Sequence, residues 1–246
     1  MSEFATSTFW LALAEIIGVN IVLSGDNAVV IALAARSLPP AQQKQAVMWG
    51  SGAAVVMRIA LTIVAVSLLK LPGLKLVGAA LLLWIAVQLL IPEGEEGGHG
   101  SGASNMGAAI RTILLADLAM SLDNVLAVAV VAKGSMVLLV AGLAISIPLV
   151  VFASTFLLKV MDRYPIIVTA GAGLLGYVAG EMVVTDIFTA PWIDANAHWL
   201  HTVVPIASAV FVITVGKFLA ARARARQGTA PLLDIAAADS ASSSRH

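Results

Sequence analysis

Two stretches of this sequence share one polar pattern. Residues 20–27 read NIVLSGDN and residues 117–124 read DLAMSLDN, so both follow [ND]-x-x-x-S-x-D-N at an offset of 97 residues. Both stretches lie in long apolar runs, and the likeness continues to Arg36 and Lys133, at equal distances beyond the two motifs. A pattern repeated at a fixed offset indicates that the chain contains two copies of one structural unit.

A second correspondence, at an offset of 93 residues, relates later parts of the two copies. Its members keep their chemical character, whether turn-forming, small, aromatic or polar. The pairs are Pro72 with Pro165, Gly78 with Gly171, Trp84 with Tyr177, Ala86 with Ala179, and Gln88 with Glu181.

The composition indicates that these copies lie in a membrane. Of 246 residues, 60% are hydrophobic and 11% are charged, whereas a soluble domain carries roughly 25% charged residues. The mean hydropathy of +0.97 leaves too little polar material to coat a globule, which argues against a soluble enzyme. No basic surface for nucleic acid is expected beyond a short C-terminal cluster. The lack of cysteine excludes disulfides, thiolate metal sites and thiol nucleophiles.

The predicted fold is all-α: a polytopic membrane protein with seven transmembrane helices. A run of about 18 or more apolar residues is typical of a transmembrane helix. The first three spans correspond to the next three, and units of three spans must cross the membrane in opposite senses. The sequence therefore predicts an inverted 3+3 helix repeat plus one extra C-terminal helix, a plan common in secondary transporters. The predicted spans are 9–35, 46–69, 74–91, 108–132, 135–158, 165–184 and 202–221.

The segments between the spans complete the predicted organisation. With the N-terminus outside, ten Lys and Arg residues fall on the cytoplasmic side and three outside, which agrees with the positive-inside rule. The C-terminus is then inside. We expect a first three-helix repeat (1–91), a flexible acidic cytoplasmic linker (92–107), a second, inverted repeat (108–184), an outer loop with the seventh helix and a basic anchor (185–226), and a disordered tail (227–246).

Five carboxylates fall well inside the predicted spans. An ionised side chain at the bilayer centre costs roughly 2.5–3.5 kcal/mol on insertion scales, so these groups should face the interior of the bundle. The only base well inside a predicted span, away from its ends, is Arg58, so protons, a cation or both must neutralise the remaining charge. The carboxylates are Glu15, Asp26, Asp117, Asp123 and Glu181.

The polar neighbours of these carboxylates offer only oxygen ligands. Such a set suits hard divalent cations such as Mg²⁺, Ca²⁺ or Mn²⁺. Hydrogen bonding between helices is an alternative explanation for isolated Ser, Asn and Gln residues. It explains the duplicated Asp-Asn pairs less well, because hydrogen bonding does not require a carboxylate. The neighbours are Asn20, Ser24, Asn27, Gln88, Ser121 and Asn124.

Three stretches resemble the TerC family of integral membrane proteins, close to its YjbE-type members and grouped with the LysE-like transporters. They are SGDNAVVIALAARSLPP (24–40), DLAMSLDNVLAVA (117–129) and GYVAGEMVVTD (176–186). Members of this family are linked to tellurium resistance and to manganese export. The resemblance therefore implies Mn²⁺ efflux across the cytoplasmic (inner) membrane of a bacterium.

The resemblance also implies a set of metal-binding residues. The two motifs map onto Asp26 with Asn27 and onto Asp117 with Asp123 and Asn124, and Glu181 lies in the matching sixth-span stretch. Position 20 is Asn where its repeat mate, position 117, is Asp, so the site has one charge fewer than a symmetric pair. Accessory residues would be Glu15, Asn20, Ser24, Gln88 and Ser121.

The expected mechanism is alternating access of one unit against the other, with no permanently bound cofactor and no enzymatic reaction. When the ion leaves, neighbouring carboxylates should take up protons, because like charges disfavour ionisation. Divalent cation/proton antiport is the cycle that follows. The resemblance also allows a membrane interaction protein that supports metal supply to exported proteins, or tellurium resistance, without transporting. The linker, with His99, would then be a docking element.

One further group of residues lies in the predicted outer loop. Asp194, His198 and His201 follow the pattern Asp-x-x-x-His-x-x-His, which could capture a metal ion. Trp192 and Trp199 lie beside them. On sequence alone we favour an aromatic belt at the membrane interface with incidental histidines.

Overall fold

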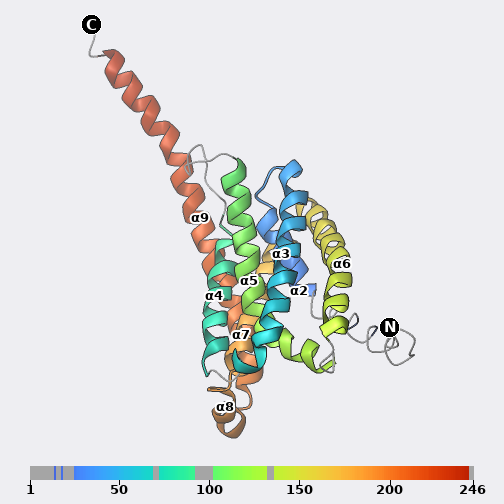
Figure 1. Ribbon diagram of the computed structural model, residues 1–246. Coiled ribbons are helices and arrows are strands. Elements are labelled where there is room, and N and C mark those ends of the chain that lie inside the picture. The colour runs from blue at the N-terminus through green and yellow to red at the C-terminus, as the bar shows by residue number, and fades with distance from the viewer. Residues whose placement is uncertain are drawn as a thin grey trace.

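The protein is a bundle of α-helices, seen here in a computed structural model (Figure 1). The structure describes residues 14, 18, 25–68, 72–91, 102–131 and 136–243. Within these ranges it describes all side chains except those of residues 62–68, 102–105, 122–131, 136–144, 146 and 226–243.

Each predicted span overlaps one of the helices α2 to α7 or α9, and the short helix α8 was not predicted. All secondary structure among the described residues is helical. The elements are α2 (Gly25–Ala35), α3 (Pro40–Leu68), α4 (Leu74–Gln88), α5 (Gly102–Val131), α6 (Met136–Arg163), α7 (Ile166–Val184), α8 (Ala190–Asn196) and α9 (Leu200–Ser243).

The long helices run up and down the bundle in turn. In Figure 1, α3 descends, α4 rises, α5 descends and α6 rises, and α8 lies at the lower end. α3, α5 and α6 contain 29, 30 and 28 residues. At 1.5 Å per residue they are about 42–45 Å long, which exceeds the hydrocarbon core of a bilayer.

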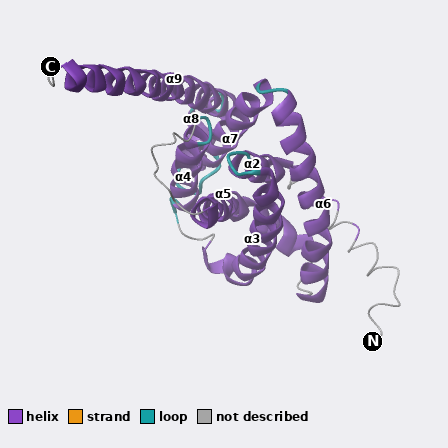
Figure 2. Cartoon of the chain, turned by 90° about the horizontal axis from the view of Figure 1, so that it is seen from above, coloured by secondary structure: helices purple, strands orange, loops and turns teal. Residues whose placement is uncertain are grey.

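The helix pairs that join α2–α4 to α5–α7 come in matched sets. If α2, α3 and α4 are exchanged with α5, α6 and α7, the pair α3–α5 becomes α2–α6, and the pair α4–α5 becomes α2–α7. All four pairs are in contact. The pairs α2–α5, α3–α6 and α4–α7 map onto themselves, and they are in contact as well. α9 packs mainly on α7, and Figure 2 shows it extending from the side opposite α6.

Glycines on α7 allow its close packing on α9. A Cβ atom added at Gly180 would lie 2.5 Å from the Cα atom of Pro205, and one at Gly176 would lie 2.8 Å from the carbonyl oxygen of Ser208. Small residues at a helix interface allow the two backbones to approach in this way, as they do in membrane helix pairs.

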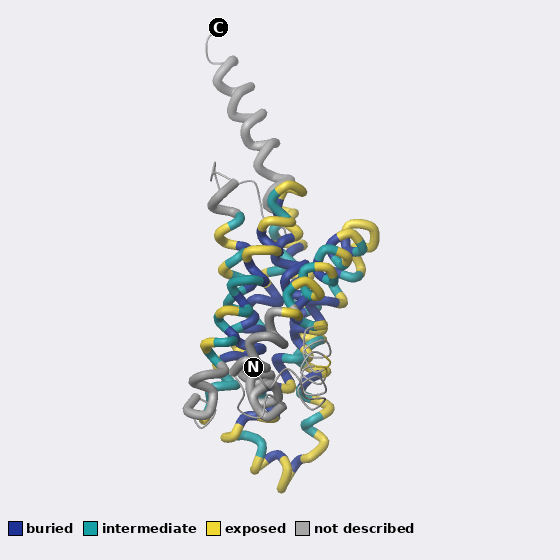
Figure 3. The backbone as a smooth tube through the Cα atoms, turned by 45° about the vertical axis from the view of Figure 1, so that its right-hand side comes forward, coloured by how far each residue is buried: buried dark blue, intermediate teal, exposed yellow. Residues whose placement is uncertain are grey.

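The outer surface of the bundle is apolar and aromatic. Large side chains such as Trp49, Phe152, Ile166 and Phe188 are at least 66% exposed. Figure 3 shows buried residues along the inner faces of the helices. An apolar surface of this extent indicates contact with lipid or with another protein. Among the described residues, Ile166–Val184 and Leu200–Ala225 are long and apolar enough to cross a membrane by themselves.

Two helices extend into segments for which we predicted no regular structure. α5 begins at Gly102, inside the predicted linker, and α9 continues to Ser243, through the predicted disordered tail. The α9 extension contains several alanines, as in AAAD (236–239), and alanine is the strongest helix former, whereas the α5 extension GASNMG (102–107) contains one. Composition alone identified the C-terminal segment as polar, but it did not weigh its helix propensity.

Candidate functional site

The centre of the bundle holds a buried ion pair between α3 and α5, one helix from each predicted repeat. Arg58 on α3 is 5% exposed and Asp117 on α5 is 6% exposed. The Arg58 Nη2 atom donates to Asp117 Oδ1 at 2.5 Å. Arg58, the only base that we expected inside the membrane, is therefore the direct partner of one predicted metal ligand.

Ser121 completes this network. Arg58 Nε donates to Ser121 Oγ at 3.0 Å, and Ser121 Oγ donates to Asp117 Oδ2 at 3.1 Å. Ser121 lies four residues after Asp117, one turn further along α5, and it is fully buried. The carboxylate therefore has a partner on each oxygen, as a buried charge requires.

A small cavity adjoins the ion pair. Its volume is about 20 Å³, enough for one water molecule or one ion without its water shell. Its polar lining comes from Asn27 on α2, Ser51 and Arg58 on α3, and Asp117 on α5, and its apolar lining includes Ile147 on α6. Helices from both predicted repeats therefore contribute to its wall. The Ser51 hydroxyl is buried and has no hydrogen-bond partner among the described residues.

Asp26 lies beside this group on α2. The backbone N–H of Asn27 donates to Asp26 Oδ1 at 2.9 Å. Asp26 is half-buried and lies within electrostatic range of both Arg58 and Asp117. The structure therefore brings the acidic residues Asp26 and Asp117, one from each motif, into one electrostatic group.

A proline lies on α6 at the level of the cavity. Pro148 is inside the helix, next to Ile147 in the cavity wall. Proline has no N–H to donate, so α6 lacks one hydrogen bond of its ladder at this point. A local weakness of this kind is a place where a helix can bend.

Two predicted site residues lie elsewhere. Gln88 and Glu181 are exposed, so the expectation that they face the interior is not met by their positions. Gln88 is the last residue of α4, and Glu181 lies near the end of α7, away from that helix's buried face. Apolar context alone did not indicate which side of each helix faces inwards.

The remaining predicted residues cannot be placed in the site. Glu15, Asn20 and Ser24 lie outside the described residues. Asp123 and Asn124 lie on α5, six and seven residues beyond Asp117, and their side chains are outside the description.

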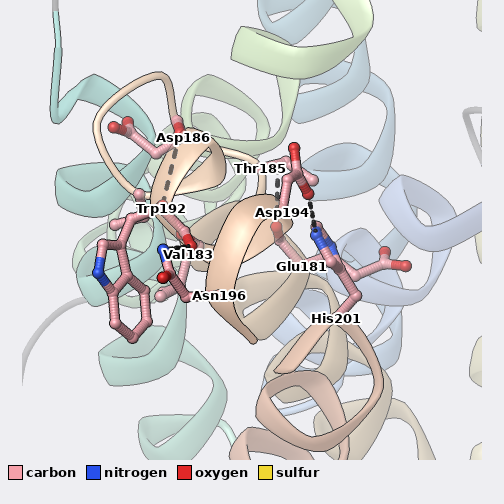
Figure 4. Close-up of polar contacts among 9 residues, drawn as sticks. Glu181, Val183, Thr185, Asp186, Trp192, Asp194, Asn196 and His201 are labelled. Carbon is pink, nitrogen blue, oxygen red and sulfur yellow. Dashed lines mark hydrogen bonds and ion pairs between the residues drawn. The ribbon is translucent and has the colours of Figure 1, made fainter. Parts of the chain in front are cut away.

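Sequence reasoning missed one buried carboxylate. Asp186, just after α7, is 1% exposed (Figure 4). It accepts hydrogen bonds from the backbone N–H groups of Gly73 at 3.0 Å, Lys75 at 3.1 Å and Phe188 at 2.8 Å. It therefore joins the end of α7 to the start of α4. The signal was its place at the end of the stretch GYVAGEMVVTD, where the chain leaves the apolar span.

The turn held by Asp186 also separates two predicted spans. Gly73 has a φ of +81°, a left-handed conformation that glycine adopts without strain. α4 begins directly after it, at Leu74. The predicted span 74–91 therefore begins at a defined helix cap, Gly73.

An all-helical bundle with an apolar surface and a buried, partnered ion pair is the architecture of an integral membrane protein. Comparison with known proteins gives the family. Residues 5–225 match the integral membrane protein TerC family, and the chain belongs to it.

Several bacterial membrane proteins are similar to this chain. The uncharacterized membrane protein YjbE of Bacillus subtilis is 42% identical over 205 residues, which are 83% of this chain and 93% of that protein. The UPF0053 inner membrane protein YgdQ of Escherichia coli is 30% identical over 173 residues, covering 63% and 73% of the two chains. No solved structure matches this chain.

Proposed function

We propose that this protein exports a divalent metal cation, Mn²⁺ in the first instance, across the bacterial cytoplasmic membrane in exchange for protons. The observation that carries the proposal is the cavity of about 20 Å³ between the two repeats, lined by Asn27, Ser51 and Asp117. Oxygen donors in a small cavity suit a hard divalent ion.

The proposed ligands come from both motifs. Asp26 and Asn27 contribute from α2, and Asp117 contributes from α5. Asp123 and Asn124 follow on the same helix, and we include them among the ligands only because they repeat the Asp-Asn pair of the first motif. Glu181 is left out, because its side chain is exposed on α7.

Arg58 has a defined role in this proposal. It neutralises Asp117 while no metal ion is bound, so the empty protein does not bury a bare charge. An arriving ion competes with the guanidinium for the same carboxylate oxygens. Arg58 must therefore withdraw from Asp117 when the ion binds.

Protons complete the proposed cycle. Asp26 and Asp117 carry two negative charges, and Arg58 balances one of them. After the metal ion leaves, a proton on Asp26 makes the group neutral without further movement of the backbone. Release of that proton when the next ion binds couples the two flows in opposite directions.

The proposed motion is a movement of α2–α4 against α5–α7. The matched helix contacts described above support an inverted repeat, since exchange of the two units relates them in sets. The interface between the units passes through the cavity. Opening that interface at one end while closing it at the other gives alternating access.

We place the end that carries the N-terminus of α5 in the cytoplasm. A basic pocket of about 690 Å³ lies at this end, with Arg36, Lys217 and Arg224 in its lining. Excess basic charge is typical of the cytoplasmic side of membrane proteins. The α8 end is then outside the cell.

The test is Mn²⁺ flux into proteoliposomes with a metal-sensitive dye and a pH dye inside. We expect Mn²⁺ movement with opposite proton movement in the native protein, and loss of both in Asp26→Asn and Asp117→Asn. Asp162→Asn, an exposed carboxylate at the end of α6, is the matched control and should transport normally.

Two results would contradict the proposal. Equal Mn²⁺ flux in both aspartate variants would remove the site, and Mn²⁺ flux without proton movement would remove the antiport. A native protein that inserts normally but moves no divalent ion would favour the alternative, a membrane interaction protein.

A further inference from the structure

We propose a second metal site, at the α8 end of the bundle, formed by Asp194, His198 and His201. One ligand atom from each of these residues lies within 4.8 Å of the others. The site is separate from the central cavity, and it does not depend on the transport function proposed above. Its donor set, two imidazoles and one carboxylate, suits a divalent transition-metal ion such as Zn²⁺.

The local backbone explains why the three side chains converge. They stand at i, i+4 and i+7, a spacing that would place them on one face of an unbroken helix. α8 ends at Asn196, but the chain continues to wind: Leu200 N–H donates to Ala197 O at 2.9 Å, and His201 N–H donates to His198 O at 3.2 Å. Ala197, with φ −151° and ψ 54°, is not helical, so the turn between α8 and α9, rather than one continuous helix face, brings the three side chains together.

The side chains are already in contact. His201 Nε2 lies 2.7 Å from Asp194 Oδ1, and the rings of His198 and His201 have centroids 5.1 Å apart. Figure 4 shows the Asp194 carboxylate directed at the His201 ring. Ligand atoms bound to one tetrahedral Zn²⁺ lie roughly 3.3 Å apart, as follows from bond lengths of about 2.0–2.1 Å. A metal ion therefore fits here if His201 Nε2 and Asp194 Oδ1 move about 0.6 Å apart and the more widely spaced ligand atoms, up to 4.8 Å apart, close by as much as about 1.5 Å.

The site is open to solvent. Asp194 has 59% of its side chain exposed, and His201 has 28%. Three protein ligands leave at least one position for water, which is the pattern of open zinc sites. An aromatic belt explains the exposed Trp192 and Trp199 but does not require three ligand atoms to meet, so it accounts for only part of this region.

The selectivity of the site should differ from that of the central cavity. Mg²⁺ and Ca²⁺ prefer oxygen ligands, so they should compete poorly for two imidazoles. Zn²⁺ in the presence of excess Mg²⁺ therefore reports on this site rather than on the carboxylates inside the bundle.

The experiment is calorimetric titration of the purified full-length protein in detergent with Zn²⁺ and excess Mg²⁺. We expect one bound Zn²⁺ per chain. His198→Gln and His201→Gln should each weaken binding by at least tenfold, and Asp194→Asn should also weaken it. Thr202→Ala, an exposed neighbour that contributes no ligand, should bind as the native protein does.

The other two histidines of the chain provide the decisive control. His99 and His246 are the remaining members of the four, so the double variant His99→Gln/His246→Gln should keep the site intact. Loss of Zn²⁺ binding in that variant, or full binding in His198→Gln/His201→Gln, would overturn the inference. Asp117→Asn should bind Zn²⁺ normally here, so failure of the central site and failure of this one are distinguishable.

Discussion

Replacement of Arg58 tests the central ion pair most directly. Arg58→Met keeps a long apolar stem and removes the charge, so it leaves Asp117 buried beside Ser121 with no cation. Breaking a buried pair from one side costs about 3–5 kcal/mol, because the remaining charge is uncompensated. For a chain of this size, the loss corresponds to a fall in melting temperature of roughly 6–20 °C.

A double-mutant cycle isolates the pairing from other effects of the substitution. Asp117→Asn alone strands the Arg58 charge, so it should destabilise the protein by a similar amount. The double variant Arg58→Met/Asp117→Asn buries neither charge of the pair, so its loss of unfolding free energy should be clearly smaller than the sum of the losses in the two single variants. Additive losses would show that the two side chains do not act as a pair.

The same variant also tests competition between Arg58 and the metal ion. If withdrawal of the guanidinium opposes binding by about 3 kcal/mol, its removal should tighten Mn²⁺ binding by about a hundredfold. Added Mn²⁺ should therefore raise the melting temperature of Arg58→Met much more than that of the native protein. Thermal melts in detergent over a series of Mn²⁺ concentrations measure both effects. Equal Mn²⁺ dependence in the two proteins would refute the role given to Arg58.

Three further predictions concern the parts that hold the bundle together and orient it. Asp186→Ala leaves three backbone N–H groups without their acceptor, so we expect a loss of about 2–4 kcal/mol in the free energy of unfolding, measured by denaturant titration in micelles. Gly180→Ala should push α7 away from α9 and lower the free energy of unfolding by about 1–3 kcal/mol. Gly52→Ala is the control: no atom lies within 4 Å of its new Cβ, so it should not destabilise the protein. Equal melting temperatures of the two variants would contradict the close packing of α7 on α9. The chain has no cysteine, so single cysteines can report its orientation. Ala195→Cys should react with an impermeant thiol reagent on intact cells, and Ser101→Cys should react only after lysis; the reverse pattern would invert the assigned topology.

The long helices could be predicted because a single physical requirement sets them. An apolar run of membrane length must satisfy its own backbone hydrogen bonds, so it forms a helix whatever its neighbours are. The limits of the helices depend on weaker effects. α8 is 7 residues long, too short for an apolar run to reveal it, and its start depends on Pro191 in the first turn.

The inward-facing side of each helix could be predicted only where the pattern was duplicated. Asp117 and Ser121 face the interior, as their spacing on one face suggested. Gln88 and Glu181 form a repeat pair too, yet both are exposed near the ends of their helices. A polar residue near a helix end can reach the membrane surface, so its position inside an apolar run does not force it inwards.

The pairing of Arg58 with Asp117 depends on the packing of α3 against α5, which no local pattern encodes. The sequence shows one base among five carboxylates, and charge balance alone would allow that base to join any of them. In the structure Arg58 pairs with Asp117 of the second motif. The equivalent position of the first motif is Asn20, which carries no charge. The asymmetry of the repeat therefore has a physical consequence: Asp117 is the carboxylate that pairs with Arg58, and Asp26 is the one to which the proposed function assigns a proton or a metal ion.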